Sequence, residues 1–162
     1  MTIRSMFLAC AVYLTGIGIF SFVVGRLVPK SLFLHDRFPF RPFAAEQGGK
    51  AYARLGVRSW KDAMPDMSKV FPAMIPSKKL PPRLNVPALV RMVQETCVAE
   101  LTHAMLCLLG FGCVFIEKDA LGWVLAILFA VGNLPYIVIQ RYNRPKLLRI
   151  LEKLENQTHS IH

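Results

Sequence analysis

Three polar residues with helical spacing, Thr96, Glu100 and His103, are the strongest candidates for chemistry in this chain. Positions three, four and seven apart share one face of an α-helix. A carboxylate one turn from an imidazole can accept a hydrogen bond from one ring nitrogen and leave the other nitrogen as a base, as in the deprotonation of a hydroxyl group. We therefore predict that His103 and Glu100 are catalytic, with Thr96 and Glu95 as substrate-binding neighbours. The alternative is a structural polar pair between membrane helices.

A second polar cluster, QRYNRP, lies where a later apolar stretch ends. Asn133, Gln140 and Arg144 share one helical face, and Arg141 and Asn143 flank it. Arginines in such a place can bind a phosphate or carboxylate, or stabilise an oxyanion. We predict that these five residues bind substrate. The alternative is ordinary basic flanking of a membrane span.

The first cluster lies within residues 86–116, which we predict to be one long helix. Asn85 is a capping residue, Pro87 suits a first turn, and Gly110 and Gly112 weaken the helix without ending it. At about 1.5 Å per residue such a helix is about 46 Å long, more than the roughly 30 Å of bilayer hydrocarbon. Ionisable residues inside such a span indicate a functional site.

Composition places the whole chain in a membrane. It has 162 residues, of which 54% are hydrophobic, and a formal net charge of +10. The apolar runs predict an all-α membrane protein that forms a single integral membrane domain over residues 1–162. We expect three transmembrane helices, at about 6–28, 98–116 and 120–139, together with interfacial segments. A secretory signal peptide is the alternative for the first run. Only Arg4 precedes the run and the other basic residues follow it, which favours an uncleaved anchor.

The remaining segments are basic. Residues 26–95 contain 13 Lys and Arg against 5 Asp and Glu, and the proline-rich part at 29–85 mixes these with aromatic residues, as interfacial segments do. Pro145 is expected to end or kink the third span, before an amphipathic surface helix at about 146–156. Basic segments stay in the cytoplasm, so we predict a multi-pass cell-membrane protein with its N-terminus outside and its C-terminus inside. The same rule explains the charge without nucleic acid.

The four cysteines lie in apolar stretches without a CxxC pair or a Cys/His cluster. Buried small hydrophobic residues explain them better than a disulfide framework or a zinc site does. We therefore expect no metal, and the chain contains no Gly-rich signature for a nucleotide cofactor.

Three blocks of sequence resemble a known family: GVRSWKDAMPD at Gly56–Asp66, ETCVAELTH at Glu95–His103 and NLPYIVIQRYNRPKL at Asn133–Leu147. They are similar to the small membrane acyltransferases typified by glycosyl-4,4'-diaponeurosporenoate acyltransferase, an activity that completes a carotenoid by adding a fatty acyl chain to a glucose hydroxyl. The resemblance runs from about Leu55 to Leu154 and implies that Trp60 and Lys61, at the family's Trp–Lys pair, bind substrate.

Spacing and resemblance together predict a membrane acyltransferase that moves an acyl chain onto a sugar hydroxyl of a glycolipid or glycosylated carotenoid at the cytoplasmic face. Its partners would be an acyl donor, a glycolipid acceptor and membrane lipid, with no nucleic acid and no cofactor. Two alternatives stay open: a small membrane methyltransferase or reductase with a cytoplasmic cofactor site, and a non-enzymatic membrane subunit. The sequence leaves the acyl donor, the acceptor lipid, an acyl-enzyme and the oligomeric state undetermined.

Overall fold

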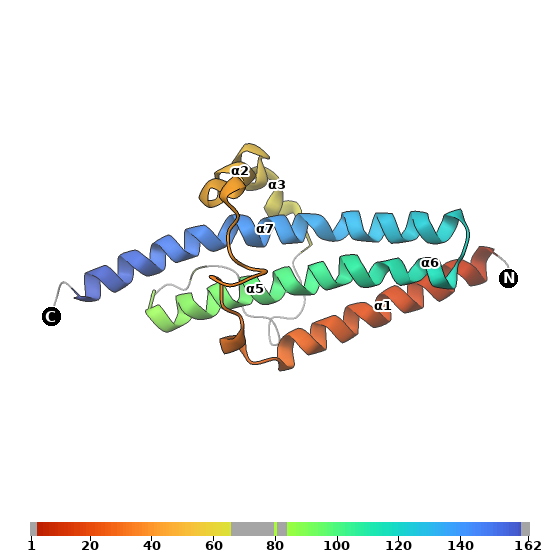
Figure 1. Cartoon of the computed structure of the whole chain (residues 1–162), viewed down its shortest axis with the longest axis horizontal. Coiled ribbons are helices and arrows are strands. Elements are labelled where there is room, and N and C mark those ends of the chain that lie inside the picture. The colour runs from red at the N-terminus through yellow and green to blue at the C-terminus, as the bar shows by residue number, and fades with distance from the viewer. Residues whose placement is uncertain (1–2, 66–79, 81–83, 160–162) are drawn as a thin grey trace. The chain divides into compact units, whose positions relative to one another are not determined.

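The computed structural model describes residues 3–65, 80 and 84–159, and the regular secondary structure in these residues is helical (Figure 1). Three helices are long: α1 (Ile3–Leu27), α5 (Val86–Leu109) and α7 (Ala120–His159). A turn of 3-10 helix, η4 (Gly110–Gly112), joins α5 to the short helix α6 (Cys113–Ile116). Short helical segments lie between α1 and α5: η1 (Lys30–Leu32), η2 (Ala44–Gly49), α2 (Lys50–Arg54), α3 (Val57–Trp60) and η3 (Lys61–Ala63).

Three helical stretches of the described chain are long and apolar enough to cross a membrane: Arg4–Leu27, Val86–Ile116 and Ala120–Gln157. The predicted all-α fold with three spans is therefore confirmed. The predicted interfacial segment 29–85 falls only partly within the described residues, because 66–79 and 81–83 lie outside them.

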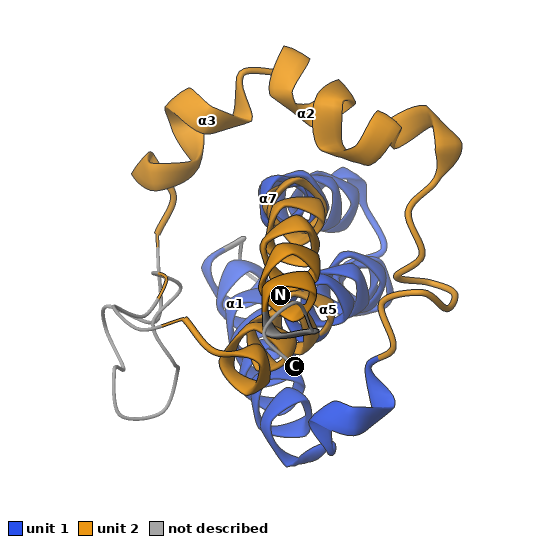
Figure 2. Cartoon of the chain, turned by 90° about the vertical axis from the view of Figure 1, so that its left-hand side faces the viewer, with its two compact units in different colours: residues 1–33, 98–138 blue, residues 34–97, 139–162 orange. Residues whose placement is uncertain are grey.

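The chain divides into two compact units (Figure 2). Unit 1 consists of residues 1–33 and 98–138, and unit 2 consists of residues 34–97 and 139–162. Helices α5 and α7 contribute residues to both units.

The start of α5 follows its capping signal. The side-chain oxygen of Asn85 accepts a hydrogen bond from the backbone N–H of Ala88 at 2.8 Å, which satisfies one of the N–H groups that the first turn leaves without a helical partner. Pro87 has no N–H to satisfy, so it fits in the same turn. The predicted helix start is therefore confirmed.

Helix α7 is longer than the sequence indicates. It continues through Pro135 and Pro145 to His159, where a span ending near residue 139 and a separate tail helix at 146–156 were expected. In unit 2 the apolar face of the tail packs on the first turns of α5, with Leu147 buried against Leu89 and Val93. Burial of this face offsets the hydrogen bond that Pro145 removes.

The two glycines near the end of α5 have a packing role in unit 1. The 3-10 turn at Gly110–Gly112 shifts the backbone hydrogen-bonding pattern, and the hydroxyl of Tyr13 on α1 donates a hydrogen bond to the carbonyl of Leu109 at 2.7 Å. A Cβ atom at Gly112 would lie 2.0 Å from that hydroxyl oxygen. Beside this contact, Cys10 and Cys113 are buried with Ala126, as expected for cysteines that serve as small apolar residues.

The turn between α6 and α7 contains the polar residues Glu117, Lys118 and Asp119. The carboxylate of Asp119 accepts a hydrogen bond from the N–H of Leu121 at 3.0 Å and so caps the start of α7. Gly122 follows, where a Cβ atom would lie 2.0 Å from the carbonyl oxygen of Glu117. Only glycine allows this close approach.

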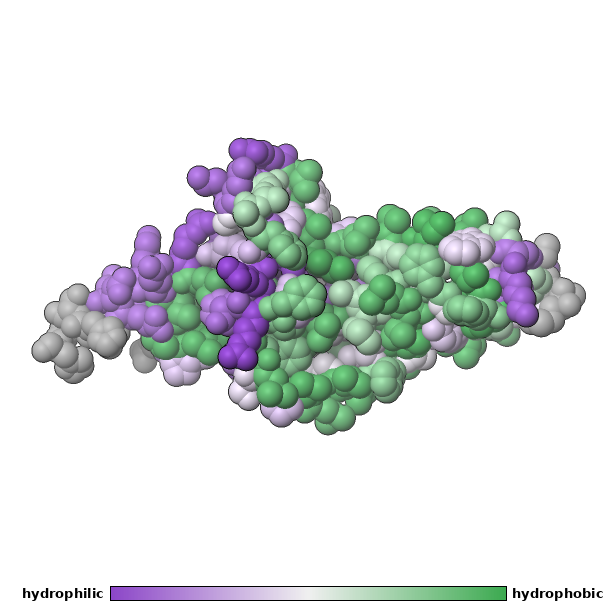
Figure 3. Space-filling view, viewed as in Figure 1, coloured by the Kyte–Doolittle hydropathy of each residue, from purple (hydrophilic) through white to green (hydrophobic). Residues whose placement is uncertain are grey.

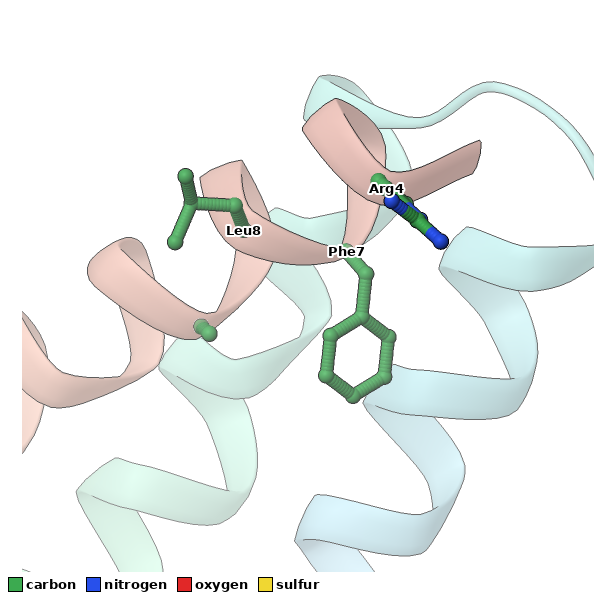
Figure 4. A pocket seen from close by; sticks show the side chains of 4 residues that line it. Arg4, Phe7 and Leu8 are labelled. Carbon is green, nitrogen blue, oxygen red and sulfur yellow. The ribbon is translucent and has the colours of Figure 1, made fainter. Parts of the chain in front are cut away.

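Unit 1 exposes large apolar side chains to an extent typical of lipid-facing surfaces: Phe115 is 82% exposed, Leu128 is 63% exposed and Leu8 is 64% exposed. Apolar residues, green in Figure 3, cover much of the face shown there. A shallow hollow on α1 is lined by Arg4, Phe7, Leu8 and Ala11 (Figure 4). These four side chains include no carboxylate, imidazole or thiol, so the hollow is not a candidate for acid–base chemistry.

We predict that Gly112→Ala destabilises unit 1. The added methyl group must displace the Tyr13 hydroxyl from the Leu109 carbonyl, and such a hydrogen bond in a membrane helix bundle contributes about 1 kcal/mol. The unfolding temperature of the detergent-purified protein should fall by roughly 2–4 °C. Gly132→Ala is the matched control, because no atom lies within 4 Å of its added Cβ. Equal unfolding temperatures for the two variants would contradict this role for Gly112.

Candidate active site

His103, the predicted base, lies on α5 in unit 1 and is partly buried. Its Nδ1 atom is 2.8 Å from the amide oxygen Oδ1 of Asn133 on α7. The amide nitrogen of Asn133 donates in turn to the backbone carbonyl of Phe129 at 2.8 Å. The ring of Tyr136 stacks on the imidazole, with centroids 4.5 Å apart and planes 8° from parallel. Two residues of α7, one turn apart, therefore orient the imidazole of His103. Asn133 contacts its Nδ1 atom, and Tyr136 restricts the plane of its ring.

Glu100 was predicted as the residue that supports His103. It lies one turn earlier on α5 and its residue surface is only 4% exposed. The hydrogen-bonding partner described for Nδ1 of His103 is Asn133, so the Glu100–His103 hydrogen bond stays a prediction. A buried carboxylate in a membrane span costs free energy, so its presence indicates a function. Glu100 therefore remains a candidate functional residue.

Among the described residues of unit 2, Arg144 is the most completely buried polar residue, with 2% of its surface exposed. Its Nε atom donates to the hydroxyl of Thr96 at 2.9 Å, and Nη1 donates to the carbonyl of Phe40 at 2.8 Å. The guanidinium carbon lies 5.7 Å from the centroid of the Phe40 ring. The hydroxyl of Thr96 itself donates to the carbonyl of Val93 at 2.6 Å. The predicted neighbours Thr96 and Arg144 are thus in direct contact, and the arginine binds protein groups.

Arg141, one turn before Arg144, binds the same segment of unit 2. It forms an ion pair with Glu46 and donates to the carbonyl of Pro39 at 2.7 Å. Its guanidinium carbon also lies 4.7 Å from the centroid of the Phe43 ring. Arg141 and Arg144 therefore hold two consecutive carbonyls, those of Pro39 and Phe40, against α7. We call residues 39–46 the clamped segment.

Glu46 connects the clamped segment to α2. Its Oε1 atom accepts hydrogen bonds from both Arg141 and the hydroxyl of Tyr52, the latter at 2.9 Å. Partial burial of the phenol, together with the neighbouring Glu46 carboxylate, raises the pKa of Tyr52 to about 12. Tyr52 consequently remains a neutral hydrogen-bond donor to Glu46 throughout the physiological pH range.

Two glycines after Glu46 allow the backbone to approach α7. Gly49 has a φ of 92°, which disfavours any side chain, and its Cβ position is 3.6 Å from the carbonyl oxygen of Tyr142. The carbonyl of Gly48 accepts a hydrogen bond from Arg149 at 2.7 Å. The contact of Gly48 and Gly49 with α7 thus depends on backbone conformations that only glycine adopts readily.

The remaining predicted substrate-binding residues all belong to unit 2. Gln140 is buried, and Asn143 and Glu95 are partly buried. Trp60, at the end of α3, donates its indole N–H to the carbonyl of Leu55 at 3.1 Å. Lys61 lies 3.8 Å from the carboxylate of Asp62. Among the described residues, no group of three His, Cys, Asp or Glu side chains is placed to hold a metal ion.

Three residues of these clusters were not predicted from the sequence: Tyr136, Glu46 and Tyr52. Tyr136 lies three residues after Asn133 on the same helical face, and that spacing was a usable signal. Glu46 and Tyr52 lie in a segment without helical periodicity, where spacing does not indicate which side chains meet. Chemically, the unit 1 cluster presents an oriented imidazole suited to proton transfer. The unit 2 cluster is a buried network of hydrogen bonds with one described ion pair, Arg141–Glu46.

We predict that Arg144→Lys disrupts unit 2 although it keeps the charge. A lysine lacks the planar fork that reaches Thr96 and Phe40 together, and a lost hydrogen bond to a charged group costs about 1.5–3 kcal/mol. The variant should unfold at a lower temperature and expose the clamped segment to protease. Arg149→Lys is the matched control, since Arg149 is exposed and makes one described hydrogen bond to a carbonyl. Equal stability of both variants would contradict a clamping role for Arg144.

Comparison with known proteins relates these clusters to one family. The family model described as glycosyl-4,4'-diaponeurosporenoate acyltransferase matches residues 35–153, which include both the His103–Asn133 contact and the Thr96–Arg144 contact. Relatives with this name from Staphylococcus aureus strains MRSA252, N315 and USA300 are 29% identical to this chain over 136 residues, covering 83% of this chain and 81% of each relative. No solved structure matches the chain. Because the family model covers well over half of its residues, this chain belongs to the glycosyl-4,4'-diaponeurosporenoate acyltransferase family and is an acyltransferase.

Proposed function

We propose that this acyltransferase moves a fatty acyl chain onto a sugar hydroxyl of a glycolipid or a glycosylated carotenoid at the cytoplasmic face of the cell membrane. The name of its relatives refers to a glycosylated diaponeurosporenoate as the acceptor. The observation that carries the proposal is the imidazole of His103, which Asn133 and Tyr136 orient within a helix long and apolar enough to span a membrane. Acyl transfer to a sugar hydroxyl needs a base such as this imidazole.

A sugar hydroxyl is a poor nucleophile at neutral pH, so it must lose its proton as it attacks. In the proposed step, His103 accepts that proton while the hydroxyl oxygen bonds to the carbonyl carbon of the acyl donor. The bond between this carbon and the leaving group then breaks, and the imidazolium returns the proton to the leaving group. The donor is a thioester or an oxygen ester, such as acyl-CoA, acyl carrier protein or a phospholipid. Glu100 is proposed to favour the imidazolium through its negative charge rather than through a hydrogen bond from the neutral ring, because Nδ1 donates to Asn133 and Nε2 must accept the hydroxyl proton.

The residues of unit 2 receive separate roles. We propose that Arg141 and Arg144 support substrate binding indirectly, by holding the clamped segment, since their described donors contact protein groups. The other predicted substrate-binding residues of this unit keep that role in the proposal: Trp60, Lys61, Glu95, Thr96, Gln140 and Asn143.

Family membership favours this function over the two alternatives drawn from the sequence. A methyltransferase or reductase requires a cofactor site, whereas the matched family is one of acyltransferases. A non-enzymatic subunit would have no use for an oriented imidazole. Lipids occupy the remaining apolar surface, which includes the exposed side chains of α1.

His103→Ala should lower turnover by roughly 10²–10⁴-fold, the usual contribution of a positioned base, while the protein still inserts and folds. Glu100→Gln should cost less, because it retains the shape and removes only the charge. The assay measures labelled acyl transfer to a glucosylated lipid by purified variants, with acyl-CoA, acyl carrier protein and phospholipid donors tested in turn.

His35→Ala is the matched control for His103→Ala, because His35 lies outside the candidate spans. Retention of wild-type turnover by His103→Ala with every active donor would remove this residue from the mechanism. Failure of all three donors with wild-type protein, while a methyl or hydride donor reacts, would overturn the proposed reaction.

The proposed orientation places the N-terminus outside and the C-terminus in the cytoplasm, because the basic residues concentrate after the first span and after residue 140. In intact cells, a membrane-impermeant thiol reagent should label a cysteine introduced at Lys118, in the turn before α7. It should not label one introduced at Lys50, in the basic central segment. The reverse labelling pattern would refute this orientation.

A further inference from the structure

The side chain of Asn133 has only one amide orientation that satisfies both of its contacts. Its nitrogen Nδ2 donates to the Phe129 carbonyl at 2.8 Å, and a carbonyl oxygen can only accept. The amide oxygen Oδ1 therefore faces His103, 2.8 Å from Nδ1. An exchange of the two amide atoms would place two oxygens against each other.

An amide oxygen is also only an acceptor, so the proton in the contact with His103 resides on Nδ1. In a neutral imidazole with a protonated Nδ1, the lone pair belongs to Nε2. We infer that Asn133 is a positioning residue that keeps His103 in the Nδ1–H tautomer, so that Nε2 is the atom that takes up the hydroxyl proton. The proton on Nδ1 follows from the contact with Asn133, whereas the use of Nε2 as the base rests on the proposed function.

Tyr136 completes the arrangement by fixing the plane of the imidazole. The two rings are 8° from parallel with centroids 4.5 Å apart, and Tyr136 lies one turn after Asn133 on α7. The hydrogen bond determines which nitrogen is protonated and the stack restricts rotation of the ring. Together they point the Nε2 lone pair in one direction, which matters because a misaligned base loses most of its effect.

An amide suits this position better than a carboxylate would. A charged residue inside a span is expensive, whereas a neutral amide that has both its donor and its acceptor satisfied is not. Asparagine performs the same orienting task for the histidine of papain-like proteases. The competing explanation is that Asn133 is only a structural link between α5 and α7, without influence on the tautomer.

Nitrogen NMR of protein labelled with ¹⁵N in its histidine rings separates these explanations, because protonated and unprotonated ring nitrogens differ widely in chemical shift. The signals of His103 are identified as those absent from His103→Gln. In wild-type protein, Nδ1 should be protonated and Nε2 unprotonated at a pH where the ring is neutral. Asn133→Leu should lose this preference, and Asn133→Asp, which still offers an acceptor oxygen, should restore it.

Activity measured on the same samples connects the tautomer to catalysis. Asn133→Leu should lower kcat about 10²-fold or more with a much smaller change in KM, and Asn133→Asp should recover a large part of kcat. Thr15→Val is the matched control: it removes a polar group from a span, but the Thr15 hydroxyl donates only to a carbonyl of its own helix, that of Ala11.

The outcomes distinguish the inference from the function on which it rests. An Nε2–H tautomer in the wild-type protein would overturn the inference, and so would an unchanged Nδ1–H preference in Asn133→Leu. A correct tautomer shift without loss of kcat would overturn the catalytic role of His103 and leave the positioning by Asn133 intact. If Asn133→Leu does not fold, the wild-type spectrum together with Asn133→Asp still tests the tautomer.

Discussion

The hydrogen bond between His103 and Asn133 is the contact that organises the polar interior of unit 1. Polar groups surrounded by hydrocarbon must find partners within the protein, because no water is present to solvate them. The amide of Asn133 meets this requirement twice, toward the imidazole and toward the Phe129 carbonyl. One residue thereby links α5 to α7 and fixes the protonation pattern of a catalytic candidate.

Unit 2 follows a different principle, in which charge is neutralised locally. Arg141 and Arg144 each insert a guanidinium among backbone carbonyls and aromatic rings, and the carboxylate of Glu46 balances Arg141. Planar guanidinium groups with several donors suit such sites better than ammonium groups do. The conspicuous cationic motif QRYNRP thus builds an internal clamp, although its composition alone equally fits an anion-binding site.

Transfer of an acyl group depends mainly on acid–base chemistry and on the positioning of the reacting groups. In unit 1, His103 is an oriented candidate base. In unit 2, the contacts of Arg141 and Arg144 fix the clamped segment against α7. Unit 1 thus offers a group for the chemistry, and unit 2 offers a rigid support.

Local signals in the sequence were sufficient for the helical fold, its three spans and the start of α5 at Asn85, since apolar runs and capping residues act over short distances. The shared helical faces of Thr96 with His103 and of Asn133 with Arg144 also followed from periodicity. Tertiary structure decided the rest. Helix α7 continues through Pro145 because its apolar face packs on Leu89 and Val93, and Asn133, from a different helix, lies against Nδ1 of His103. Helical spacing determines which side chains share a face, but the partner from another helix, and with it the tautomer of a histidine, is determined only when the helices pack.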